Sequence, residues 1–101
     1  MPKLYEYLGL VIFFYSNEHE PVHVHGQRDG RESKAEFILQ AGELIEIRIR
    51  DVKGRSPLTG KDLQNFEKLV STYSAEIVQK WVDYFVYHRR LTSELITRQL
   101  P

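Results

Sequence analysis

The stretch Val22–Phe37, with the sequence VHVHGQRDGRESKAEF, decides the fold because it reads as two strands joined by a tight turn. Asp29-Gly30 is typical of a two-residue type I′ turn, which needs positive φ at both central positions. Pairing across this turn places like opposite like at every rung: Arg28 with Arg31, His25 with Lys34, Val24 with Ala35, His23 with Glu36 and Val22 with Phe37. A slip of one residue would mix the two faces, so the pattern supports this register.

Three of the four histidines lie just before and inside this hairpin, in Asn17-Glu18-His19-Glu20-Pro21-Val22-His23-Val24-His25. Pro21 fixes its own φ and disfavours helix for the residue before it, so a loop ends here and a strand begins. Alternation along that strand puts His23 and His25 on one face, about 6.6 Å apart, and both valines on the other. Two imidazoles at this spacing form a half-site for a divalent transition metal such as zinc or nickel.

The cluster is open to several interpretations. In one, His23 and His25 lie on a solvated sheet face and make ordinary polar contacts. In a second, His19, His23 and His25 bind a metal ion while Glu18 or Glu20 activates a bound water. A third is acid–base catalysis by a histidine and a carboxylate without metal, and a fourth is pH sensing, because such a histidine titrates near neutral pH.

Composition narrows the class of protein. With 42% apolar and 28% charged residues, the 101-residue chain is expected to be one soluble domain, 1–101. Its 14 basic and 14 acidic residues cancel, so no overall field favours nucleic acid or an anionic membrane. The absence of cysteine excludes disulfides and thiolate ligands and fits a cytoplasmic location. The longest apolar run, Leu8–Tyr15, is too short to span a bilayer, and the residues before it do not show the basic region and cleavage site expected of a signal peptide.

The segment before the histidines, Gly9–Tyr15, is rich in β-branched and aromatic residues, which predicts a strand that is apolar on both faces. Such a strand is covered on both sides, so we expect the core on one side and a partner on the other, which favours a homodimer. Met1–Tyr7 is expected to be a short lead-in.

The third strand of the predicted sheet continues to Leu39 and is followed by Gln40-Ala41-Gly42, which we interpret as a three-residue hairpin loop with glycine in the left-handed position. The fourth strand is Glu43–Asp51. This loop puts its isoleucines on the valine face, with Ile45 opposite Phe37 and Ile47 opposite Ala35. The other face collects polar side chains, namely His23, His25, Lys34, Glu36, Glu46 and Arg48.

From Lys61 the apolar period becomes helical, and Ser74 has the features of a second helix start. We predict two helices, or one bent helix, over about 61–88, packed on the isoleucine face with their aromatic residues in the core: Trp81, Tyr84, Phe85 and Tyr87. Thr92–Gln99 would add a short edge strand. The predicted fold is therefore α+β: an antiparallel sheet of four strands, or five with that edge, over about 8–51, with one or two C-terminal helices on one face.

Several of these residues resemble a known family. The stretch Phe14–His25, the Asp29-Gly30 turn, Lys34-Ala35-Glu36-Phe37 and Gln79-Lys80-Trp81 are similar to the small prokaryotic proteins grouped as domain of unknown function 4160 (DUF4160). The matching motif positions are Asn17, His19, Pro21, His23 and His25. Relatives carry two prolines before the first strand histidine, whereas this chain has Glu20-Pro21-Val22.

The resemblance implies a short α+β protein, often encoded beside a second small protein in arrangements like toxin–antitoxin modules, with no activity assigned. The first functional hypothesis is accordingly a cytoplasmic protein that binds such a partner. The second is a metal-dependent hydrolase or nuclease using the histidine cluster. The third is RNA binding on the polar face through Lys34, Arg48 and Arg50. Glu36 and Glu46 lie among these cations and weaken the case for RNA binding. Asn17, Glu36 and Arg48 are the residues expected to contact a ligand or partner.

Overall fold

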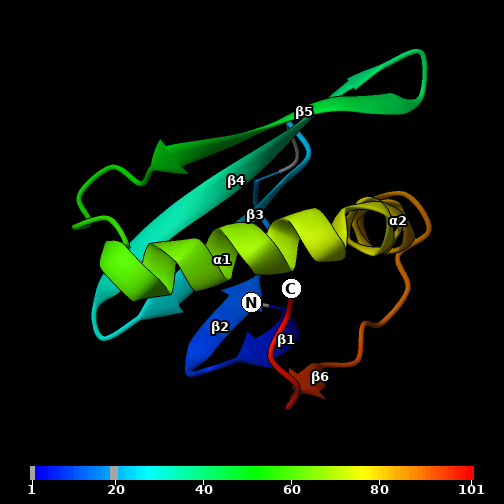
Figure 1. Cartoon of the computed structure of the whole chain (residues 1–101). Coiled ribbons are helices and arrows are strands. Elements are labelled where there is room, and N and C mark those ends of the chain that lie inside the picture. Colours follow the sequence, from blue (N-terminus) through cyan, green and yellow to red (C-terminus); the bar gives the residue numbers. More distant parts are fainter. Residues whose placement is uncertain (1, 19–20) are drawn as a thin grey trace.

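The computed structural model describes residues 2–18 and 21–101, which form one sheet and two helices (Figure 1). In chain order the elements are β1 (Lys3–Tyr7), β2 (Leu10–Phe13), β3 (His23–Arg28), β4 (Arg31–Gln40), β5 (Glu43–Asp51), α1 (Gly60–Thr72), α2 (Ser74–Phe85) and β6 (Glu94–Ile96). The predicted α+β class is confirmed. Among the described residues no helix is long and apolar enough to cross a membrane.

The sheet differs in detail from the predicted one. Its described strands number six, in the order β5-β4-β3-β2-β1-β6, and they are mixed rather than wholly antiparallel. All neighbours pair antiparallel except β1 and β6, which are parallel. Strand β6 lies inside the predicted edge segment Thr92–Gln99 and forms one edge of the sheet. Strand β1 is the strand that was not predicted, and it lies between β6 and β2 in the sheet.

Strand β1 occupies the segment expected to be only a lead-in. Its turn to β2 consists of Leu8 and Gly9, with φ of 49° and 84°. Leucine rarely adopts a left-handed backbone, so its presence does not indicate a turn. Leu8 belongs to the apolar run Leu8–Tyr15, so the turn was not predicted and no strand was expected before it. As a result β2 is shorter than the predicted Gly9–Tyr15 and spans only Leu10–Phe13.

The register of the β3–β4 hairpin is confirmed. Asp29 and Gly30 have φ of 52° and 78°, as a type I′ turn requires. The observed pairs match the predicted ones: Arg28 with Arg31, His25 with Lys34, Val24 with Ala35 and His23 with Glu36.

The β4–β5 hairpin needs a correction of register. Its loop has two residues rather than three, because Gln40 pairs with Glu43, and Ala41 and Gly42 both have positive φ. A bulge follows, in which Ile45 is the extra residue. Together these changes shift the pairing by two, so that Phe37 faces Ile47 and Ala35 faces Ile49. After the bulge, from Glu46 onward, a shift of two leaves the side chains on their predicted faces. Before it, Leu44 pairs with Leu39 and therefore lies on the valine face, opposite to its predicted side.

The helices cover the valine and isoleucine face of the sheet, as predicted, and α1 lies along it in Figure 1. The contact is close at Gly26 of β3, where a Cβ atom would lie 2.5 Å from the ring of Phe66 in α1. Trp81 is buried, but Tyr87 is 58% exposed, so its predicted place in the core is wrong. The reason is that α2 ends at Phe85, short of the predicted limit of about 88.

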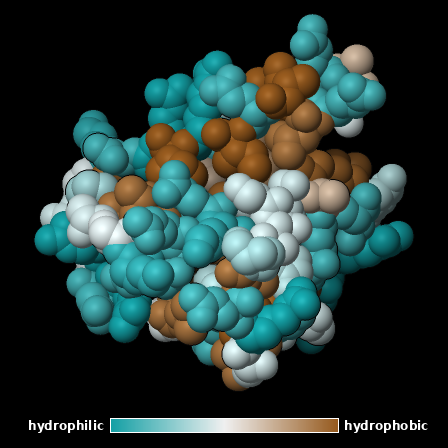
Figure 2. Space-filling view, in the orientation of Figure 1, coloured by the Kyte–Doolittle hydropathy of each residue, from teal (hydrophilic) through white to brown (hydrophobic). Residues whose placement is uncertain are grey.

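The tip of the β4–β5 hairpin extends beyond the helices (Figure 1). Ile47 and Ile49 are partly buried against the core, whereas Ile45 is 57% exposed. Leu39 and Leu44 at the same tip are also exposed. Figure 2 shows hydrophobic side chains gathered along this upper part of the molecule.

Candidate metal centre

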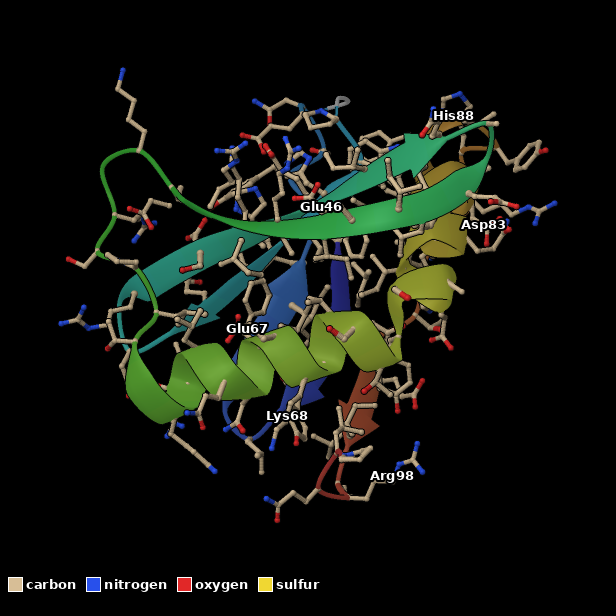
Figure 3. The ribbon with its side chains drawn as sticks, turned by 45° about the horizontal axis from the view of Figure 1, so that its top comes forward. Glu46, Glu67, Lys68, Asp83, His88 and Arg98 are labelled. Carbon is tan, nitrogen blue, oxygen red and sulfur yellow. The ribbon has the colours of Figure 1, made fainter. Side chains whose placement is uncertain are left out.

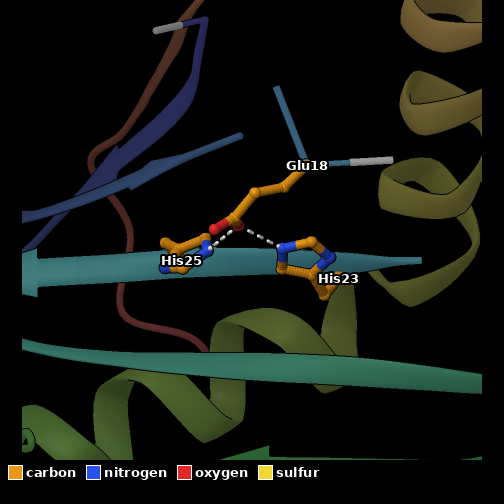
Figure 4. Close-up of side chains that lie close together, drawn as sticks. All are labelled: Glu18, His23 and His25. Atoms are coloured by element: carbon orange, nitrogen blue, oxygen red, sulfur yellow. Dashed lines mark hydrogen bonds and ion pairs between the residues drawn. The ribbon is translucent and has the colours of Figure 1, made fainter. Parts of the chain in front are cut away.

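Three possible metal ligands lie close together on the face of the sheet that α1 does not cover: Glu18, His23 and His25 (Figure 4). Glu18 Oε1 lies 2.8 Å from Nε2 of His23 and 3.0 Å from Nε2 of His25. The three ligand atoms all lie within 4.8 Å of one another. Among the described residues, this group therefore has the spacing that one metal ion needs.

Local geometry brings these side chains together. His23 and His25 are two residues apart on β3, so both point to the same face, opposite Val24. Glu18 lies in the loop between β2 and β3, where its backbone N–H donates to the carbonyl of Tyr15 at 3.1 Å. Because β2 and β3 are neighbours in the sheet, this loop starts close to the strand that carries the histidines.

The hydrogen bonds of the two Nδ1 atoms determine which ring nitrogens carry protons. Nδ1 of His23 lies 2.6 Å from the carbonyl oxygen of Pro21. Nδ1 of His25 lies 3.0 Å from Oε2 of Glu32. Both partners are oxygen acceptors, so each Nδ1 must carry the proton that it donates. In a neutral imidazole this leaves Nε2 with a free lone pair.

Both Nε2 lone pairs therefore face Oε1 of Glu18, which as a carboxylate oxygen is also an acceptor. Each Nε2 and the carboxylate oxygen repel one another at these distances unless a cation or an extra proton lies between them. Protonation of both rings would satisfy the hydrogen bonds, but it would put two buried imidazolium ions side by side, with ring centroids 5.1 Å apart. A single divalent cation removes the conflict at all three atoms.

The rings are enclosed by aromatic side chains, which lowers the local dielectric constant. His25 stacks on Phe13 with centroids 5.5 Å apart and meets the edge of Tyr15, and His23 contacts Trp81 at 5.3 Å. The histidines are only 4% and 2% exposed. The interpretation that places them on a solvated face is therefore wrong, because the loop and these aromatic rings cover them.

Burial also affects the charge states of the site. Burial lowers the pKa of His25, and the neighbouring His23 lowers it further, although Glu18 acts in the opposite direction. For Glu18, burial alone would raise the pKa, but the two histidines, which in their protonated forms would donate to this carboxylate and stabilise its charge, outweigh this and lower it. A neutral imidazole beside an ionised carboxylate is the state in which these groups bind a metal.

Glu32 is a further component, which the sequence analysis did not identify. Its side chain is fully buried, and besides His25 it accepts a hydrogen bond from the Tyr15 hydroxyl at 3.1 Å. Nε of Arg55 lies 3.8 Å from its other oxygen. Strand alternation places Glu32 on the face of His25, and that was the signal by which it could have been found. A carboxylate behind a histidine is the usual outer support of a metal ligand.

The remaining predicted site residues lie elsewhere. Glu36 is the cross-strand neighbour of His23, but its carboxylate pairs with Arg50 at 3.1 Å. Arg48 pairs with Glu46 at 2.8 Å. Asn17 is exposed in the loop. His19 and Glu20, predicted as a ligand and a catalytic carboxylate, lie outside the described residues.

The chain belongs to the family described as "Domain of unknown function (DUF4160)", which matches residues 9–82. This region contains the whole Glu18–His23–His25 group and its support, Glu32. No curated protein and no solved structure was found to match the chain.

Proposed function

We propose that this protein binds one divalent transition-metal ion through Glu18 Oε1, His23 Nε2 and His25 Nε2. One observation carries the proposal: both Nδ1 atoms already donate to oxygen, so both Nε2 lone pairs converge on the same carboxylate oxygen. The outer contacts support it too, since a metal-bound histidine commonly donates its other N–H to a backbone carbonyl or a carboxylate.

The donor set favours zinc or nickel. Two imidazole nitrogens and one carboxylate oxygen suit borderline ions, and the chain has no cysteine to provide thiolate. Ligands about 2.0–2.1 Å from a tetrahedral ion lie roughly 3.3 Å apart, so the N···O separations of 2.8 and 3.0 Å need only a small expansion. The ion would tie the loop that carries Glu18 to strand β3.

Calorimetric titration of the metal-free protein with zinc and with nickel, together with elemental analysis of the purified protein, tests this proposal. We expect one ion per chain and a loss of affinity of more than about a hundredfold in His23→Ala, His25→Ala and Glu18→Gln, beyond what an outer-shell change causes. His88→Asn is the matched control, because His88 is exposed and asparagine tolerates its φ of 55°. Binding no tighter than millimolar in the wild type would end the proposal.

Metal-dependent hydrolysis is a second candidate. Three protein ligands leave a fourth position of a tetrahedral ion for water, as in catalytic zinc sites, where the pKa of the bound water falls to about 7. The Glu18 side chain is 44% exposed, which puts one ligand of the site next to solvent.

Zinc- and nickel-loaded protein should then cleave at least one of three model substrates: a phosphodiester, a carboxylic ester or a peptide. Hydrolysis should disappear in His25→Ala and persist in His88→Asn. Activity that survives in His25→Ala would come from another source and would contradict this candidate function.

A further inference from the structure

Strand β5 has a long free edge. It is 9 residues long and lies at the end of the sheet, so among the described residues no strand pairs with its outer side. The opposite edge, β6, has only 3 residues. In Figure 3 β5 crosses the front of the view, with Glu46 on it. A long edge strand presents a row of backbone donors and acceptors that can add another strand.

Exposed apolar side chains accompany this edge. Leu39, Leu44 and Ile45 are 37%, 36% and 57% exposed, and they lie within three residues of the turn at Ala41-Gly42. Figure 2 shows hydrophobic side chains in this upper part of the molecule. A groove of about 290 Å³ separates the tip from α2, and it is lined by Leu39, Gly42, Leu44, Ser74, Ala75 and Val78. The edge therefore combines free backbone groups with apolar surface, as a protein-binding edge does.

The order of charges along β5 indicates which strand fits beside it. In Glu43-Leu44-Ile45-Glu46-Ile47-Arg48-Ile49-Arg50-Asp51, two glutamates precede two arginines, and Asp51 ends the strand. If two copies pair antiparallel about a two-fold axis at Ile47, Glu46 of each faces Arg48 of the other, and Ile45 faces Ile49. Both ion pairs lie on one face and the isoleucines on the other, which matches the alternation of the strand.

Other registers fit less well. A shift by one residue opposes isoleucine with charge, and a shift of the axis to Arg48 brings two arginines together. The pairing of Leu44 with Arg50 and of Glu43 with Asp51 is less favourable, but the bulge at Ile45 already bends the strand away from a regular edge there. The complementary part is thus the regular segment 46–49, with Ile45 of the bulge at its end.

We propose that β5 pairs antiparallel with β5 of a second copy of this chain, about a two-fold axis at Ile47, so that two sheets join into one. The interface is isologous: each Glu46 exchanges its ion pair with Arg48 of its own chain for one with the partner's Arg48, and the exposed Ile45 packs beside the partner's Ile49. This dimer is independent of the metal site, because Glu18, His23 and His25 belong to β3 and the loop before it.

Charge reversal at the edge tests the register. The molar mass of the full chain, measured by light scattering and sedimentation across a range of concentrations, should approach twice 11.9 kDa. Glu46→Arg places like charges together at both symmetric positions and should weaken dimerisation at least about tenfold. The double variant Glu46→Arg/Arg48→Glu restores opposite charges and should recover the affinity to within about threefold. Circular dichroism confirms that each variant is folded.

Cysteine coupling tests the position of the axis, because the chain has no cysteine of its own. Ile47→Cys puts two thiols at directly opposite positions, about 4.5–5.5 Å apart between Cα atoms, which a disulfide can bridge. In the matched control, Ile49→Cys, the two thiols lie roughly 13 Å apart along the strands and should not couple.

A protein that is monomeric at all concentrations would overturn the proposal, even if the edge bound a second small protein. A dimer that Glu46→Arg leaves unchanged would place the interface elsewhere and also overturn it. So would failure of the double variant to recover dimerisation, or coupling through residue 49 rather than 47.

Discussion

Glu32 shows how a single buried side chain determines the chemistry of its neighbours. Its carboxylate is fully buried, lies 3.0 Å from Nδ1 of His25 and accepts the hydroxyl of Tyr15. Burying a carboxylate is costly unless hydrogen bonds compensate it, and these contacts do so. The same contact holds the proton of His25 on Nδ1, and this directs the Nε2 lone pair toward Glu18.

Replacement of Glu32 by glutamine should therefore weaken metal binding without removing a ligand. The amide keeps the shape of the side chain but loses its charge, and half of its polar atoms become donors. We expect a loss in zinc affinity of about 10–100-fold, measured by calorimetry. Glu36→Gln, on the same strand but paired with Arg50, is the control and should bind as the wild type does. Equal affinities in both variants would contradict a supporting role for Glu32.

At this scale the sequence predicts what depends on neighbours along the chain. The shared face of His23 and His25 follows from alternation within one strand, and it is confirmed. The enclosure of their rings does not, because Phe13, Tyr15 and Trp81 arrive from β2, the loop after it and α2. Their positions depend on how separate elements pack, and the periodicity of one segment does not predict which other segment will cover it.

The contact of α1 with the sheet depends on one position in β3. Gly26 lies opposite Ser33 in the ladder, and the ring of Phe66 occupies the space that a side chain would take there. Glycine in a strand interior commonly marks such a close approach. This contact seats the helix on the strand that carries both histidines.

Gly26→Ala should destabilise the protein by about 1–3 kcal/mol, because a core that is already filled cannot accept another methyl group without strain. Phe66→Ala alone should cost about 3–5 kcal/mol. In the Phe66→Ala background, however, the added methyl group fills space and its penalty should vanish. Urea unfolding of the four members of this double-mutant cycle measures the coupling. Additive effects would show that the two residues do not compete for the same space.

The turns explain which elements the sequence predicts. Asp29-Gly30 adopts positive φ with residues suited to it, so the β3–β4 hairpin is predicted in full register. The turns at Leu8-Gly9 and Ala41-Gly42 use a leucine and an alanine at φ of 49° and 51°, which most turns avoid. The first of these turns explains why strand β1 was not predicted. The second explains part of the error in the predicted register of the β4–β5 hairpin. The helices were predicted more closely, since their apolar period is local.

At the scale of the whole molecule, strands from the first and the last part of the chain form one side of the sheet. β1 and β6 pair with each other, and both lie outside residues 9–82, the part that the family matches. The Tyr7 hydroxyl accepts a hydrogen bond from the backbone N–H of Leu100 at 2.9 Å. Ile96 and Leu100 are buried in the common core. The described terminal segments therefore stabilise the domain that carries the candidate site.

Two neighbouring residues of β6 test this stabilisation. Ile96 is 5% exposed and Leu95 is 65% exposed, so they differ in burial while sharing one strand. Ile96→Ala should lower the free energy of unfolding by about 2–4 kcal/mol, through lost burial and the cavity left behind. Leu95→Ala should change it by less than about 0.5 kcal/mol. Chemical denaturation gives both values, and similar effects would mean that β6 does not dock as described.

The proposed metal binding must also appear in the stability of the entire chain, because an ion that binds only the folded state shifts the unfolding equilibrium. At a free zinc concentration 100 times the dissociation constant, the gain is about 2.7 kcal/mol, which corresponds to roughly 10–20 °C in the melting temperature of a domain of this size. His88→Asn should keep this increase, and His23→Ala should lose it. A chelator should reverse the increase in the wild type. An equal rise of the melting temperature in both variants would mean that zinc binds elsewhere, because His23 is a ligand of the proposed site and His88 is not.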